Sequence, residues 1–124
     1  MNVQSQARAA YSKHGAPTRT HRGTEYEIFA KITNALRIAS AKGPQGFPEL
    51  ADAIHKNRQL WTLLATDVAS KNNGLSQDLR ARLFYLAEFT QEYSPKVLRQ
   101  NASIAPLLEI NAAIMRGLNG GQSR

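Results

Sequence analysis

The stretch that decides the fold is NRQLWTLLATDVA, residues 57–69, which holds the only tryptophan and the densest run of large apolar side chains. At about 100° of rotation per residue, one face of a helix here collects the large apolar residues of this stretch and of the residues before it. They are Leu50, Ile54, Trp61, Leu64 and Val68. Burying them would stabilise the fold by roughly 1.5–3 kcal/mol per large side chain. We therefore expect this helix to be the surface on which the other helices pack.

Upstream, TEYE at residues 24–27 matches a capping box with Thr24 as the N-cap, and an apolar stripe continues from it to about Ala41. The sequence KGPQG at 42–46 breaks that pattern. Pro48 then suits the first turn of the tryptophan helix, which we expect to stop at residues 71–74 because Asn and Gly tolerate a left-handed C-cap.

Downstream, Ser76 is expected to cap one helix and Ser103 the last one. Pro95 predicts a kink, or a stop with Ser94 capping a short new turn, because proline removes a backbone donor. The glycines near the C-terminus are expected to end the last helix: Gly117, Gly120 and Gly121.

These patterns predict an all-α protein, a single small helical bundle of about five helices with short loops. The 124 residues suit one domain, which we place at 1–121. Within it, 1–23 is a loosely docked basic N-terminal segment, with a faint, alanine-rich helical stripe over 1–14 and a loop-like stretch over 15–23. Residues 122–124 are expected to be a disordered tail.

Motifs for chemistry are not found in the sequence. With no cysteine, disulfides and thiolate metal sites are excluded, and no His pair or carboxylate–His cluster has metal-ligand spacing. Neither a phosphate loop nor a nucleophile elbow occurs. No apolar run approaches the ~20 residues of a membrane span, and no secretory signal opens the chain. We expect a non-enzymatic cytoplasmic protein without a metal or cofactor.

The chain carries a net charge of +7, partly because no acidic residue precedes Glu25. The basic residues there are possible contacts for RNA or for an acidic partner: Arg8, Lys13, Arg19 and Arg22. Single-strand binders interleave such charges with aromatic side chains. That interleaving is missing here, so nucleic acid is not the favoured partner.

Two asparagines interrupt apolar faces. Asn57 falls between Ile54 and Trp61, and Asn111 falls on the apolar face of the last helix. A buried amide without partners costs roughly 1–3 kcal/mol. We expect both amides to be buried and hydrogen-bonded, to backbone, to water or to each other, and to set the register of two helices. The alternative is that one lies at a bundle end, within reach of water.

Three apolar side chains fall on otherwise polar sides of their helices: Leu63, Phe84 and Tyr85. Jointly exposed, they would line a groove for an amphipathic helix of a partner. The alternative is that neighbouring helices of the bundle cover them.

Four segments together resemble a known family: TEYEIF at 24–29, NRQLWTLL at 57–64, ARLFYLAEF at 81–89 and EINAAIMRGL at 109–118. They are similar to the FlaF flagellar biosynthesis regulators of alphaproteobacteria, and the resemblance covers nearly the whole chain. It implies a small cytoplasmic helical protein needed for filament assembly, acting on flagellin synthesis or export. It also implies work alongside FlbT, a regulator linked to flagellin messenger RNA.

The hypothesis we favour is a chaperone-like protein whose apolar groove holds an amphipathic helix of flagellin and releases it to export. The alternative is a post-transcriptional regulator of flagellin translation, acting through FlbT or by direct messenger RNA contact of the basic N-terminal segment. A third hypothesis is a scaffold for FlbT alone. Only the direct RNA contact should weaken steeply with salt.

Overall fold

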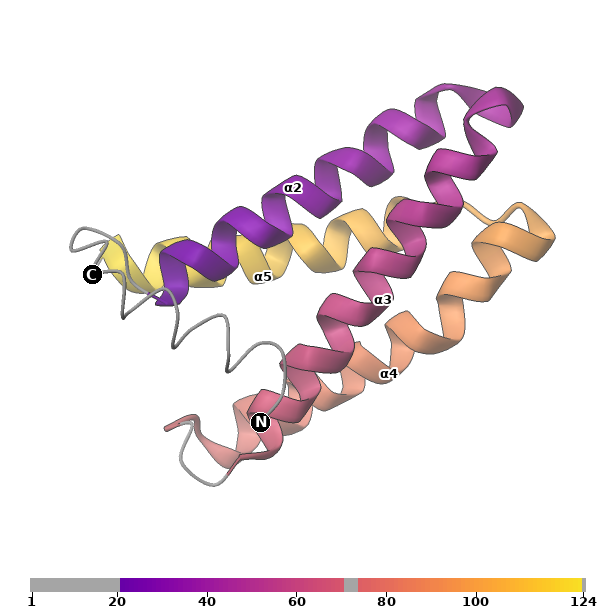
Figure 1. The fold of residues 1–124 in the computed structure, drawn as a ribbon. Helices are drawn as coiled ribbons and strands as arrows, with labels where there is room; N and C mark the ends of the chain where they lie inside the picture. Colours follow the sequence, from indigo (N-terminus) through magenta and orange to yellow (C-terminus); the bar gives the residue numbers. More distant parts are fainter. Residues whose placement is uncertain (1–20, 71–73, 124) are drawn as a thin grey trace.

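The computed structural model describes residues 21–70 and 74–123, which form four α-helices and no strand (Figure 1). In chain order the α-helices are α2 (His21–Ala41), α3 (Phe47–Ala69), α4 (Gln77–Gln100) and α5 (Ala105–Ser123). A short 3₁₀ helix, η1 (Gly43–Gly46), lies between α2 and α3. The prediction of an all-α helical bundle is confirmed. Its fifth helix, predicted over 1–14, lies outside the described residues.

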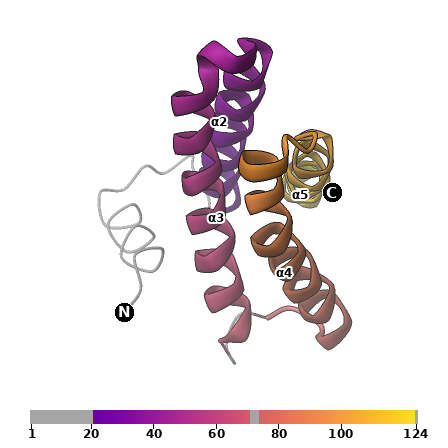
Figure 2. The same cartoon turned by 90° about the vertical axis from the view of Figure 1, so that its right-hand side faces the viewer.

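The four helices form two antiparallel pairs, and one helix of each pair packs on one helix of the other. α5 runs alongside α2, and α4 runs alongside α3, while α2 also packs on α3 (Figures 1 and 2). The pairs come together at the right-hand end of Figure 1, where η1 joins α2 to α3 and a short loop joins α4 to α5. Toward its N-terminal end α4 has α3 as its main neighbour, so the seam between these two helices borders on solvent.

The buried core consists of two clusters. In the first, side chains of all four helices meet: Leu36, Ala53, Ile54, Val97, Ile104 and Leu107. In the second, Phe29 of α2 and Ala87 of α4 pack against Trp61. The rings of Phe29 and Trp61 meet edge to face, with centroids 5.7 Å apart and planes at 79°. Trp61 is fully buried, so the stretch that organises the sequence also lies at the centre of the fold.

Local signals predicted several helix ends correctly. The hydroxyl of Ser76 accepts a hydrogen bond from the Leu79 amide at 3.2 Å, and that of Ser103 accepts one from the Ala105 amide at 3.0 Å. Pro48 lies in the first turn of α3, where its missing N–H costs nothing. α3 ends at Ala69, just before residues 71–74, and Gly74 has the positive φ of +79° expected of that stretch.

The predicted start of α2 was wrong. The helix already includes His21, so Thr24 lies inside it and is not its N-cap, and the stretch up to Gly23 is not all loop. A capping residue is worth about 1 kcal/mol. The three preceding residues contain no proline and keep their backbone donors, so the helix extends through the capping signal.

A stop at Pro95 was also wrong, because α4 continues to Gln100. Ser94 does not cap a new turn; its hydroxyl donates to the Thr90 carbonyl at 2.6 Å within the same helix. Proline removes one backbone hydrogen bond, but Ser94 just before it and Val97 two residues after it are both buried. Packing on both sides of the proline therefore holds the helix together.

The C-terminal glycines do not end α5, which runs to Ser123 and so includes the first two residues of the tail predicted to be disordered. Arg124 lies outside the described residues. A glycine inside a helix costs about 1 kcal/mol relative to alanine but keeps its N–H donor. The glycines therefore weaken the last turns without forcing them to stop.

Candidate functional site

A groove of about 750 Å³ runs along the seam between α3 and α4. Its lining comes from both helices: Trp61, Thr62, Ala65 and Thr66 of α3, and Ala81, Phe84, Tyr85, Ala87, Glu88 and Gln91 of α4. The positions recur at three- and four-residue spacing, which places them on one face of each helix. Apart from the buried Trp61, the α3 side of this lining consists of small side chains, which leave room between the two helices at this surface.

Two adjacent aromatic side chains stand on this groove. Phe84 is 40% exposed and Tyr85 is 67% exposed, although both are large and apolar. Neither belongs to the two buried clusters. A single exposed apolar residue is ordinary, but two neighbouring rings at an open groove form a patch typical of an interaction site.

Leu63 does not join the two aromatics. Its side chain is half-buried, and it is not part of the groove lining. It lies about 100° around α3 from Thr62 and so faces another side of that helix. The α3 side of the groove instead includes Thr62 and Ala65, which the sequence did not predict as site residues. The sequence feature that could have predicted them is their small size together with their spacing, since Thr62 follows Arg58 by four residues and Ala65 follows Trp61 by four.

Polar contacts fix the two helices at both ends of the groove. At one end, Arg58 Nε donates to Gln91 Oε1 at 3.0 Å, and Gln91 Nε2 donates to the Arg58 carbonyl and to Thr62 Oγ1, both at 3.0 Å. At the other end, Arg80 Nε donates to the Val68 carbonyl in the last turn of α3 at 3.1 Å. These contacts set the spacing of α3 and α4, so the groove is preformed.

The two asparagines lie in the interior and not at this surface. Both are fully buried, and Asn111 Nδ2 donates to Asn57 Oδ1 at 2.8 Å. Asn111 Nδ2 also donates to Thr33 Oγ1 at 3.0 Å, while Asn111 Oδ1 accepts from Trp61 Nε1 at 2.9 Å. This polar cluster ties α2, α3 and α5 together and positions Trp61, which is fully buried beneath the groove.

Two buried polar atoms have no hydrogen-bond partner among the described residues. They are Asn57 Nδ2 on α3 and Thr90 Oγ1 on α4. An unsatisfied buried polar atom costs roughly 1–3 kcal/mol. Asn57 Nδ2 and Thr90 Oγ1 therefore each lower the stability of the buried interior.

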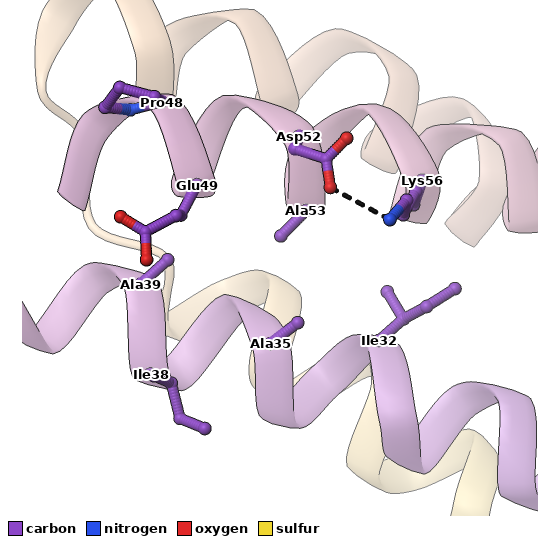
Figure 3. Close-up of a pocket in the computed structure, with 9 residues that line it drawn as sticks. All are labelled: Ile32, Ala35, Ile38, Ala39, Pro48, Glu49, Asp52, Ala53 and Lys56. Atoms are coloured by element: carbon purple, nitrogen blue, oxygen red, sulfur yellow. Dashed lines mark ion pairs between the residues drawn. The ribbon is translucent and has the colours of Figure 1, made fainter.

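A second, smaller groove of about 480 Å³ lies between α2 and α3 (Figure 3). Its lining combines aliphatic and charged residues: Ile32, Ala35, Ile38, Ala39, Pro48, Glu49, Asp52, Ala53 and Lys56. The charged groups pair within the protein, since Lys56 Nζ lies 2.9 Å from Asp52 Oδ2 and Lys42 forms an ion pair with Glu49. With its charges satisfied internally and no aromatic side chain, it is the weaker candidate.

The basic residues suggested for RNA or an acidic partner are not brought together by anything described. Arg8, Lys13 and Arg19 lie outside the described residues, and Arg22 belongs to the first turn of α2. Their role stays a prediction.

A comparison with family models matches residues 7–118 to the family described as "Flagellar protein FlaF". The match covers most of the 124 residues. The chain belongs to the FlaF family. No match was found among curated proteins or among solved structures.

As a FlaF-family chain, the protein is related to the bacterial flagellum. Both grooves and the buried asparagines fall inside the region that the FlaF match covers. Among the described helices, none is long and apolar enough to cross a lipid bilayer. The candidate functional site of this FlaF-family chain is therefore the surface groove between α3 and α4, with its two exposed aromatic side chains.

Proposed function

We propose that this FlaF-family protein binds flagellin, holding an amphipathic helix of it in the groove between α3 and α4 until export. It would act in the cytoplasm as a chaperone-like factor that supports filament assembly. The observation that carries the proposal is the pair Phe84 and Tyr85, exposed side by side at a preformed groove. Helix-in-groove recognition uses such a surface, with apolar anchors on the partner spaced at three and four residues.

The size and chemistry of the groove support a helix as the occupant. Its lining combines apolar residues, Ala65, Ala81 and Ala87 beside the two exposed rings, with polar ones, Thr62, Glu88 and Gln91. Protein interfaces commonly combine apolar and polar surface in this way. A few aromatic residues usually contribute most of the binding free energy.

The test is to replace Phe84 and Tyr85 together by alanine and to titrate the full-length protein with purified flagellin monomer in a calorimeter. Truncating aromatic anchors costs more than about 1 kcal/mol each, so affinity should fall by roughly tenfold or more. Phe47→Ala is the matched control, because Phe47 is 49% exposed and lies outside this groove.

Circular dichroism must show the same helicity for the control and the double variant. Unchanged flagellin affinity in a folded double variant would remove this groove from the site. Leu63→Ala should leave the affinity nearly unchanged, because Leu63 does not line the groove.

The alternative role is regulation of flagellin translation, through FlbT or by contact of the basic N-terminal residues with messenger RNA. It is supported by the absence of acidic residues before Glu25. A pull-down from cells, probed for flagellin, FlbT and RNA, separates the two roles. Recovery of RNA without flagellin, lost on replacing Arg8, Lys13, Arg19 and Arg22 by glutamine, would favour this alternative.

A further inference from the structure

We propose that the helix bound in the α3–α4 groove carries a carboxylate near each end of its contact and a neutral or basic middle. This inference rests on the proposed function, since it specifies the partner of the same groove. It is argued from three charged side chains that border the groove: Arg58, Arg80 and Glu88.

The two arginines point along the same faces as the groove lining. Arg58 precedes Thr62 by four residues and Ala65 by seven on α3, so the three share a face. Arg80 precedes Phe84 by four residues on α4, with the same consequence. The arginines come from different helices, and each lies at a different end of the seam.

Their positions are fixed by the contacts that close the seam. Arg58 Nε is held by Gln91 Oε1 at 3.0 Å, and Arg80 Nε is held by the Val68 carbonyl at 3.1 Å. A guanidinium has five N–H donors, so each head keeps others that can reach a carboxylate. Three ion pairs within residues 21–70 and 74–123 involve other side chains: Lys42–Glu49, Lys56–Asp52 and Arg82–Asp78.

The spacing of the arginines sets the spacing on the partner. Arg58 and Val68, which Arg80 contacts, are ten positions apart on α3, or about 15 Å at 1.5 Å per residue. On a partner helix, residues eleven positions apart are about 16 Å apart and lie on nearly the same face. A helix with acidic residues at such positions can therefore meet both guanidiniums while its apolar face covers Phe84.

Glu88 makes the pattern selective. It lines the groove on α4 between Arg80 and Gln91, three residues before Gln91, so a partner carboxylate placed between the two arginine ends would be repelled. A nucleic-acid strand has a phosphate at every nucleotide and would meet the same repulsion along the groove. The order of charges, positive, negative and positive, thus favours a helical peptide over a nucleic acid.

The test uses the full-length protein and synthetic helical peptides that share one apolar stripe. Three of them differ only at two positions eleven residues apart, which are both Glu (the end-Glu peptide), both Gln or both Lys. The fourth, the middle-Glu peptide, has Gln at those two positions and two Glu between them. Calorimetry should find the end-Glu peptide roughly five- to tenfold tighter than the Gln peptide, as expected for two partly exposed ion pairs. The Lys peptide and the middle-Glu peptide should bind more weakly than the Gln peptide.

The preference should disappear when Arg58→Gln and Arg80→Gln are combined, so that the end-Glu, Gln and Lys peptides bind this variant equally. Arg99→Gln with Arg116→Gln is the matched control: it removes the same charge at two exposed positions outside the groove and should keep the preference. The preference should also shrink at about 0.5 M salt, where the Debye length is only a few ångströms. If the glutamine variant loses helicity, the four peptides on the unmodified protein decide the matter.

Equal binding of the end-Glu, Gln and Lys peptides would overturn the charge pattern and leave the groove as an apolar site. A preference that survives in the Arg58→Gln, Arg80→Gln variant would overturn it too. Failure of the proposed function is a different result, namely unchanged flagellin binding when Phe84 and Tyr85 are replaced by alanine.

Discussion

Replacing Asn111 by alanine tests whether the buried polar cluster holds the helices in register. The Asn111 side chain is fully buried and makes three hydrogen bonds, to Trp61, Thr33 and Asn57. Its hydrogen bonds reach both other helices of the cluster, α2 and α3. Removing its side chain should therefore weaken the packing of α5 on both α2 and α3.

The expected cost follows from the groups left behind. Asn111→Ala leaves the Trp61 N–H and the Asn57 Oδ1 buried without their partner, and each such group costs roughly 1–3 kcal/mol. We expect the free energy of unfolding to fall by about 4 kcal/mol, a large part of the roughly 5–15 kcal/mol typical of a small domain. Asn57→Ala should cost only about 1–2 kcal/mol, because it removes one hydrogen bond and also an unsatisfied Nδ2.

Urea unfolding followed by tryptophan fluorescence measures both changes directly, since Trp61 is the only tryptophan and belongs to the cluster. Asn34→Ala is the matched control, because Asn34 is an exposed residue in the middle of α2 and should change stability by less than about 0.5 kcal/mol. A loss below about 1 kcal/mol for Asn111→Ala would refute the reasoning. So would a larger loss for Asn57→Ala than for Asn111→Ala.

Three further substitutions test the helix ends and the close contacts by thermal and chemical denaturation. Ser76→Ala removes the hydroxyl that accepts from the Leu79 amide and should cost about 1 kcal/mol; an unchanged midpoint would show that this cap contributes nothing. Pro95→Ala restores a helical N–H donor and should raise the free energy of unfolding by about 1–3 kcal/mol; a loss of stability would mean that the ring's packing matters more than the missing bond. Gly46→Ala would place a Cβ atom 2.5 Å from the Ala39 carbonyl oxygen and should cost about 1–3 kcal/mol, whereas a neutral result would mean that the turn shifts freely.

The position of the groove also bears on how α4 is attached to the rest of the bundle. Its seam with α3 includes polar contacts, Arg58 with Gln91 and Arg80 with the Val68 carbonyl. When a partner helix binds beside this seam, less buried apolar contact between α3 and α4 is disturbed than in a fully apolar seam. A site for a transient partner suits this position better than the apolar core does.

Much of the fold follows from local features of the sequence. The 3.6-residue period located the helices, and the hydroxyls of Ser76 and Ser103 marked two of their starts, because periodicity and capping involve residues within one or two turns. The same period placed Trp61, Asn57 and Asn111 on apolar faces, and all three are buried. It also placed Phe84 and Tyr85 away from the main apolar face of α4, where the structure leaves them exposed.

What the sequence by itself did not determine is which faces meet. The bond of Trp61 to Asn111 joins residues 50 positions apart, and that of Arg58 to Gln91 joins residues 33 positions apart. Tertiary packing also carried α4 through Pro95 and separated Leu63 from the groove. A periodic pattern gives the direction of each side chain around its own helix axis, but the angle and offset of the neighbouring helix depend on how whole surfaces fit together. For that reason the aromatic pair could be found from the sequence, while the groove beneath it and the arginines at its two ends appeared only in the folded chain.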